Sequence, residues 1–167
     1  MKPYLFLDID GVLNPDSRRV GFRKYSILGF RVLLNVEHGI RLRSLLAYYD
    51  LVWASSWQEL ANEHIGSKLF LPEIPYVDFE IRWPADRLPG SNVMVKTGKV
   101  AEYARGRPFA WVDDDFAPSD LAALASLDQE VLAVSTDPRY GITDQQFFQL
   151  EEWGEKYIDS TQEADES

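Results

Sequence analysis

Residues 4–11 read Tyr4-Leu5-Phe6-Leu7-Asp8-Ile9-Asp10-Gly11, and the rest of the chain can be interpreted from this stretch. A short apolar run ends here at two carboxylates, and Gly11 then permits a sharp turn. Such a run, bounded by turn residues, is typical of a buried strand in a parallel sheet. Ligands of these sheets bind beyond the carboxyl ends of the strands, where Asp8 and Asp10 are therefore expected.

The two carboxylates need a partner. Close to a buried strand they repel each other and lose hydration, which would raise the pKa of one of them unless a cation were bound. The alternative is an ordinary strand-ending turn, because Asp and Gly are common turn residues. An EF-hand loop is excluded, because Leu13 and Arg19 occupy the positions where it requires Gly and Glu.

Composition limits the classes of protein that are possible. The chain has 167 residues, of which 46% are hydrophobic, and this suits one domain with its own core. The absence of cysteine excludes disulfides, thiolate metal sites and cysteine nucleophiles. A net charge of −10 argues against extended nucleic-acid binding, which rewards many phosphate contacts. With no signal-peptide pattern and no apolar run of membrane-spanning length, we expect a soluble, cytoplasmic protein without membrane contacts.

Strand-like and helix-like segments alternate along the chain. We predict strands at 4–7, 51–54, 108–112 and 131–134, and helices at 37–49, 58–69, 99–105, 118–127 and 143–157. The last helix has a capping box, Thr143 with Gln146. This order predicts one α/β domain over residues 1–158, a three-layer sandwich whose central, mainly parallel sheet has helices on both faces. An irregular Pro-rich segment at 71–93, with a short edge strand at 75–79, and an acidic, frayed tail at 159–167 complete the organisation.

Three of the predicted strands end in polar side chains. These are Asp8 and Asp10, Ser55 and Ser56, and Asp113 to Asp115. If the strands are parallel neighbours, four or five carboxylates crowd at one edge, where each like-charged pair at about 4 Å costs ~1 kcal/mol in water and ~4 kcal/mol at an effective dielectric of ~20. A hard divalent cation with oxygen ligands relieves this, and Mg²⁺ also accepts a substrate phosphate oxygen. Lys96 and a serine hydroxyl would then face the remaining negative charge and cradle a phosphate.

Residues 14–36 are basic and include Arg18 and Arg19. Gly21 and Gly29 punctuate the segment, which suggests a hairpin-like flap beside the first turn. Two interpretations stand equally: a solvated basic loop, or a group of cations that meets an anionic substrate.

Here the sequence resembles a known family. Asp8-Ile9-Asp10-Gly11-Val12-Leu13-Asn14 is similar to the first motif of the haloacid dehalogenase-like (HAD) phosphohydrolases. Leu51 to Ser55 resembles the second motif, Lys96 the third and Trp111-Val112-Asp113-Asp114 the acidic fourth. All four occur in the family's order between residues 4 and 115.

The resemblance implies a Rossmann-like fold and Mg²⁺-dependent hydrolysis of phosphate monoesters through an aspartyl-phosphate. It implies that Asp8 is the nucleophile and a metal ligand, and that Asp10 is the general acid and base and binds metal through its main-chain carbonyl. Ser55, with Ser56 as its substitute, would bind the phosphoryl group. Lys96, with Lys99 as the competing choice, would offset the charge on the nucleophile and the phosphate. Asp114 would bind the metal with Asp113 in support, or the two would exchange these roles, and Asp115 is assigned to a helix start.

Many family members carry a large cap domain, and the gaps between the motifs here leave no room for one. We therefore expect an open site, whose substrate is a polynucleotide end, a phosphoprotein or a small phosphorylated metabolite. Two alternatives have no phosphatase activity: a signalling receiver domain that only accepts phosphate, and a non-catalytic relative that binds phosphate and Mg²⁺. The sequence does not identify the oligomeric state.

Overall fold

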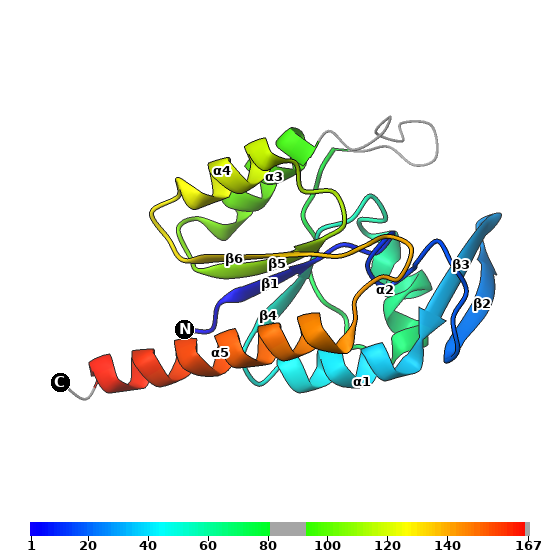
Figure 1. Cartoon of the computed structure of the whole chain (residues 1–167), viewed down its shortest axis with the longest axis horizontal. Coiled ribbons are helices and arrows are strands. Elements are labelled where there is room, and N and C mark those ends of the chain that lie inside the picture. Colours follow the sequence, from blue (N-terminus) through cyan, green and yellow to red (C-terminus); the bar gives the residue numbers. More distant parts are fainter. Residues whose placement is uncertain (81–92, 166–167) are drawn as a thin grey trace.

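The computed structural model describes residues 1–80 and 93–165, and its centre is a four-stranded parallel sheet with the order β4-β1-β5-β6 (Figure 1). The sheet strands are β1 (Tyr4–Leu7), β4 (Asp50–Trp53), β5 (Phe109–Asp113) and β6 (Val131–Ser135). A separate antiparallel hairpin comprises β2 (Phe22–Ile27) and β3 (Phe30–Asn35). The helices are α1 (Val36–Leu45), α2 (Leu60–His64), the 3₁₀ helix η1 (Gly66–Leu69), α3 (Val93–Ala104), α4 (Pro118–Ala125) and α5 (Asp144–Asp165).

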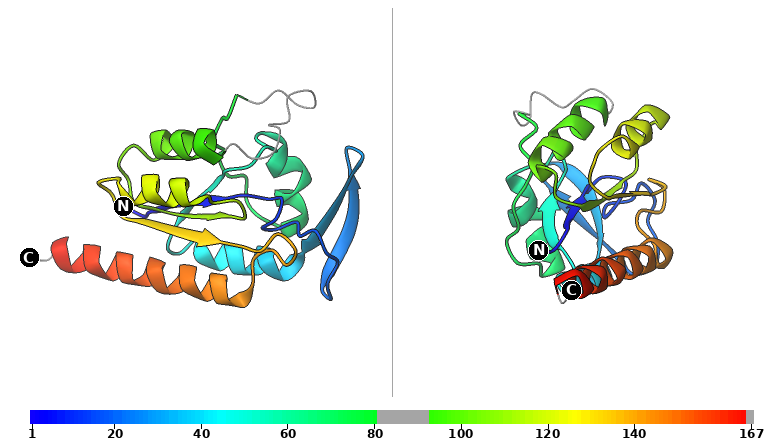
Figure 2. Two further views of the ribbon diagram at one scale, coloured as in Figure 1. Left: turned by 45° about the horizontal axis from the view of Figure 1, so that its top comes forward. Right: turned by 90° about the vertical axis from the view of Figure 1, so that its left-hand side faces the viewer.

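Helices cover both faces of the sheet. Figures 1 and 2 show α1 and α5 on one face and α3 and α4 on the other. Alternate side chains of β1 enter the two layers: Leu5 and Leu7 belong to the core shared with α1 and α5, and Phe6 to the core shared with α3 and α4. The predicted α/β, Rossmann-like sandwich is confirmed.

The register of the strands positions the site. Leu7 on β1 pairs with Trp53 on β4 and with Val112 on β5. Asp8 and Asp113 therefore leave the sheet at the same edge, and Ser55 follows two residues after Trp53. This convergence is the one on which the predicted metal site depends.

The hairpin β2–β3 lies within the predicted basic segment 14–36, beyond the carboxyl edge of the sheet (Figure 2). Its turn uses positive φ at Leu28 and Gly29. Asn14, at the end of the first turn, accepts a hydrogen bond from the backbone N–H of Leu33 at 2.8 Å. The hairpin is thus fastened to the turn that carries Asp8 and Asp10.

Several helix boundaries differ from the sequence expectation. The predicted helix 58–69 is divided into α2 and η1, with Ile65 between them at φ −111°. The helix expected from 99 begins at Val93, so that Lys96 lies within α3 rather than before it. Asp115 does not begin a helix, because α4 starts at Pro118. Ala117 is the N-cap residue of α4, and its backbone N–H donates to the carboxylate of Asp120.

The prediction of a frayed tail at 159–167 was wrong for residues 159–165, which continue α5. No Pro or Gly interrupts this stretch, so each added residue extends a helix that is already nucleated. One half of the predicted Thr143–Gln146 capping box, at the other end of α5, is confirmed, since the Gln146 side chain accepts from the Thr143 N–H at 2.9 Å.

The Pro-rich segment is described only as far as Glu80, and its remaining predicted residues up to 92 lie outside the described part. Instead of a strand at 75–79 it forms one bridge, in which Trp53 pairs with Tyr76 beside β4. Among the described helices, none combines the length and apolarity needed to cross a bilayer.

Candidate active site

Lys96 joins two carboxylates that come from neighbouring strands. Its Nζ lies 3.2 Å from Asp8 Oδ2 and 2.5 Å from Asp113 Oδ2. Asp8 follows β1, Asp113 ends β5, and Lys96 projects from α3. The side chain of Asp113 is 1% exposed and that of Lys96 is 14% exposed, so the three charges are largely withdrawn from water. Such a group is stable only when its charges compensate each other.

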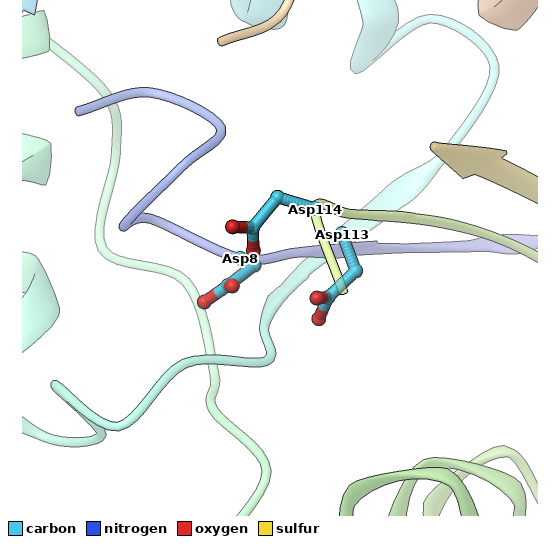
Figure 3. Close-up of side chains that lie close together, drawn as sticks. All are labelled: Asp8, Asp113 and Asp114. Atoms are coloured by element: carbon cyan, nitrogen blue, oxygen red, sulfur yellow. The ribbon is translucent and has the colours of Figure 1, made fainter. Parts of the chain in front are cut away.

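Asp114 adds a third carboxylate. One oxygen from each of Asp8, Asp113 and Asp114 lies within 4.8 Å of the others, and Figure 3 shows these side chains at the adjoining ends of β1 and β5. Gly11 has φ +77°, and a Cβ there would overlap the Asp114 carboxylate. Only glycine lets the first turn pass this close to Asp114.

Asp113 and Asp114 make different contacts. Both oxygens of Asp113 accept hydrogen bonds, one from Lys96 and one from the backbone N–H of Asp115 at 3.1 Å. The Asp114 carboxylate, by contrast, packs beside Gly11. Asp113 is therefore committed to holding the lysine and the loop, whereas Asp114 retains ligand capacity.

Burial and the neighbouring charges shift the pKa values of the residues in this cluster. Burial raises the pKa of Asp8 well above its ordinary value, and the neighbouring Asp113 and Asp10 add to the rise while Lys96 opposes it. Burial, and then Asp113, raises the pKa of Asp114 to about 6. Burial alone would lower the pKa of Lys96, but Asp8 and Asp113 outweigh it and raise that pKa above its ordinary value.

Asp10 is held by two side chains. Its Oδ1 accepts from Asn14 Nδ2 at 2.8 Å, and its Oδ2 accepts from Trp57 Nε1 at 3.0 Å. Asn14 belongs to the first turn and Trp57 to the loop after β4, so the carboxylate is fixed by both segments. Asp10 itself is exposed, in contrast to Asp8, which is 7% exposed.

Ser55 is buried beyond the end of β4, and Ser56 is exposed. The backbone N–H of Ala54 donates to Leu7 O at 2.7 Å, which brings the loop after β4 beside the end of β1. Ser55 Oγ accepts from the Trp57 N–H at 3.3 Å. Accepting that bond leaves the hydroxyl proton of Ser55 able to donate.

Three further residues predicted for the site, Arg18, Arg19 and Lys99, do not join the carboxylate cluster. Arg18 and Arg19 are exposed in the loop between β1 and β2, and the guanidinium carbon of Arg19 lies 4.9 Å from the ring centroid of Tyr140. Lys99 does not contact Asp8 or Asp113, but pairs with Glu80 at 3.2 Å. The structure thus separates the two candidate lysines and brings only Lys96 to the cluster.

The donor set suits a hard divalent cation. Asp8, Asp113 and Asp114 offer only oxygen ligands, which Mg²⁺ prefers, and they carry more negative charge than Lys96 alone balances. Burial, and to a smaller extent the neighbouring carboxylates, raises the pKa values of Asp8 and Asp114, so a bound cation would stabilise their ionised forms. The residues present therefore fit such an ion.

Sequence reasoning missed two residues that support the site. Trp57 binds Asp10, and the buried Asp120 accepts from Thr97 Oγ1 at 3.0 Å, which ties α4 to the turn of α3 that carries Lys96. Trp57 stands two residues after Ser55, but no periodic pattern in the sequence distinguishes it from a core tryptophan. The Pro118-Ser119-Asp120 order did contain a signal, because an acidic residue at the third helical position is a capping signature.

Comparison with known proteins gave one match. A protein-family model, described as "HAD domain in Swiss Army Knife RNA repair proteins", matches residues 4–147. This range includes the whole central sheet and every residue of the carboxylate cluster. No match was found among curated proteins or among solved structures.

Proposed function

Because the chain belongs to the family of HAD domains in Swiss Army Knife RNA repair proteins, we propose that it is a Mg²⁺-dependent phosphatase that removes a terminal phosphate monoester from a polynucleotide end. The observation that carries the proposal is the contact of Lys96 with both Asp8 and Asp113, beside Asp114. The small-metabolite and phosphoprotein substrates expected from the sequence remain as competitors in the test. The cytoplasmic location expected from the sequence stays a prediction.

In the first step, an oxygen of Asp8 attacks the phosphorus and the bond to the leaving oxygen breaks. This forms an aspartyl-phosphate on Asp8. Lys96 lies 3.2 Å from Asp8 Oδ2 and offsets the negative charge that the nucleophile and the phosphoryl group bring together. The Ser55 hydroxyl would donate to a phosphoryl oxygen, with the exposed Ser56 as the less suitable substitute.

Asp10 moves the proton in both steps. It donates a proton to the leaving oxygen in the first step and takes one from the attacking water in the second, which releases phosphate and restores Asp8. Its exposure places it in contact with solvent, and its two hydrogen bonds fix its direction. A residue that must exchange protons with a leaving group and with water needs both properties.

Asp8, Asp114 and the main-chain carbonyl of Asp10 would hold Mg²⁺, with Asp113 behind them. When bound, the ion supplies positive charge that keeps Asp8 ionised and orients a phosphate oxygen. A receiver domain has no step that needs a general acid, so the fixed Asp10 favours catalysis over that alternative.

The test uses RNA oligonucleotides that carry a 5′- or a 3′-phosphate, an aryl phosphate, a phosphopeptide and a sugar phosphate, each with Mg²⁺ or with EDTA. We expect Mg²⁺-dependent release of phosphate from an RNA end. Asp8→Asn should abolish it, with a loss of at least about a thousandfold. Asp16→Asn, an exposed aspartate in the neighbouring loop, is the matched control and should retain activity.

Equal activity in Asp8→Asn and wild type would overturn the assignment of the nucleophile. Binding of Mg²⁺ without hydrolysis of any substrate in the panel would support the non-catalytic alternative. Labelling by acetyl phosphate without turnover would support the receiver alternative.

A further inference from the structure

A second surface lies on the same rim as the carboxylates. The loop after β6, residues 136–143, is fastened to the first turn by two hydrogen bonds of 2.8 Å: Thr136 Oγ1 donates to Gly11 O, and the Ile142 N–H donates to Val12 O. Figure 1 shows the loop between β6 and α5 beside the chain that follows β1. Whatever this loop binds is therefore held next to Asp8 and Asp10.

The loop presents an aromatic ring with a cation from each of two segments. Tyr140 is 44% exposed. The guanidinium carbon of Arg19 lies 4.9 Å from its ring centroid, and that of Arg139 lies 5.2 Å from it. Arg139 is oriented by Asp137, whose Oδ1 accepts from Arg139 Nε at 3.0 Å. We call Arg19, Arg139 and Tyr140 the arginine–tyrosine platform.

The two loops that meet at the platform are fixed and locally basic. The backbone N–H of Asp16 donates to Pro138 O at 2.8 Å, so the loop after β1 is bound to the loop after β6. Arg31 on β3 donates to the backbone carbonyl of Asp16 at 2.8 Å and adds a further cation. Residues 14–21 and 136–143, taken together with Arg31, contain four arginines and two aspartates, in a chain whose net charge is −10.

We propose that the arginine–tyrosine platform binds the nucleotide adjacent to the terminal phosphate of a single-stranded polynucleotide. The inference rests on the proposed function, because it assumes that the scissile phosphate lies at Asp8. The exposed Tyr140 ring offers a face on which a base of any sequence stacks, and Arg planes stack in the same way. The exposed guanidinium of Arg19 would meet the phosphodiester. A sugar phosphate has no aromatic ring and therefore cannot stack on this platform.

The test compares two substrates of the full chain, an RNA oligonucleotide with a terminal phosphate and a sugar phosphate, which has no base to stack. For Tyr140→Ala we expect a rise in KM of about tenfold for RNA, with kcat/KM for the sugar phosphate unchanged. Tyr140→Phe keeps the ring and should behave as wild type. Phe148→Ala removes another exposed aromatic, on α5, and is the matched control.

A binding measurement tests the platform independently of catalysis. A fluorescently labelled, hydroxyl-ended single-stranded RNA is titrated into wild type, Tyr140→Ala and Arg19→Gln. We expect weaker binding in both variants and a smaller salt dependence in Arg19→Gln, because one phosphate contact is lost.

These measurements distinguish failure of the platform from failure of the proposed phosphatase activity. If RNA is hydrolysed but Tyr140→Ala and Arg19→Gln bind and turn over RNA as wild type does, the platform is wrong and the phosphatase stands. If hydroxyl-ended RNA binds through Tyr140 but no RNA end is hydrolysed, the platform stands and the phosphatase fails. A Tyr140→Ala defect that is equal for RNA and for the sugar phosphate also overturns the platform. Binding of a phosphopeptide as tightly as the RNA would overturn it too.

Discussion

Trp57 Nε1 donates a hydrogen bond of 3.0 Å to Asp10 Oδ2, and this bond connects the loop after β4 with the turn after β1. Asn14 holds the other oxygen of Asp10 at 2.8 Å. The proposed general acid is therefore oriented by a residue that does not touch the substrate in the proposed mechanism. In the proposed mechanism Trp57 is a positioning residue, and its removal should affect proton transfer rather than binding.

Trp57→Phe keeps most of the ring but removes the donor. We expect kcat for the phosphatase reaction to fall roughly ten- to a hundredfold, because general acid–base catalysis depends on the position of the group, with little change in KM. The matched control is Trp53→Phe, which removes a hydrogen bond of 2.9 Å to Asn62 in the core and should lower stability without lowering kcat. An altered pH profile in Trp57→Phe alone would identify positioning. Equal effects of the two substitutions on kcat would contradict this role.

Lys96→Met removes the only positive charge among the residues that the structure places in contact with Asp8 and Asp113. Two buried carboxylates would then face each other, so we expect a loss of about 3–5 kcal/mol in the free energy of unfolding without Mg²⁺, together with loss of activity. Added Mg²⁺ should restore part of the stability but not the activity. Urea unfolding with and without Mg²⁺ measures this.

Lys99→Met is the control, because this lysine lies on the same helix and pairs with the exposed Glu80. It should change neither stability nor activity substantially. If Lys99→Met abolished activity and Lys96→Met did not, the assignment of the lysine would be reversed.

His38 should make the fold sensitive to acid. It packs between Phe22 and Phe147, and burial lowers its pKa from 6.5 to about 4, with Asp144 opposing the shift and Arg41 adding to it. A lowered folded-state pKa means that the unfolded chain binds the proton first. The contribution of neutral His38 to the free energy of unfolding is therefore fully present above about pH 6.5. It is lost as the pH falls toward about 4, by up to ~3 kcal/mol.

His38→Leu should reduce the loss of stability between about pH 7 and about pH 4, as measured by urea unfolding at each pH. The same substitution at His64, the other histidine of the chain, is the control. An unchanged pH dependence in His38→Leu would show that the carboxylates alone cause the acid sensitivity.

The sequence was informative where a local pattern determines structure. The apolar run before Asp8 predicted β1 with its bounds, and the similar runs before Ser55 and Asp113 predicted the neighbouring strands within a residue or two. Because parallel strands end at one edge, the convergence of Asp8 and Asp113 followed from those strands alone.

The remainder depends on contacts between distant segments. No pattern in the sequence predicts the hydrogen bond from Trp57 to Asp10 or the packing of Arg19 on Tyr140. In each pair the two side chains come from loops that follow different strands. That Lys96, and not Lys99, contacts Asp8 and Asp113 also needed the structure, since both lysines lie on α3 and only the direction of their side chains differs. The helical state of residues 159–165 was missed because acidic composition was interpreted as solvation, although it does not oppose helix formation.

The most direct test of the account is to trap the covalent step. Asp10→Asn should still allow Asp8 to attack an activated aryl phosphate, whose leaving group needs no proton, but should slow the attack of water on the aspartyl-phosphate. After acid quench with Mg²⁺ present, peptide mass spectrometry should find the mass of one phosphoryl group on Asp8, and none in the Asp8→Asn, Asp10→Asn double variant. Absence of the phosphoryl group from Asp8, while the aryl leaving group is still released at an undiminished rate, would contradict the account.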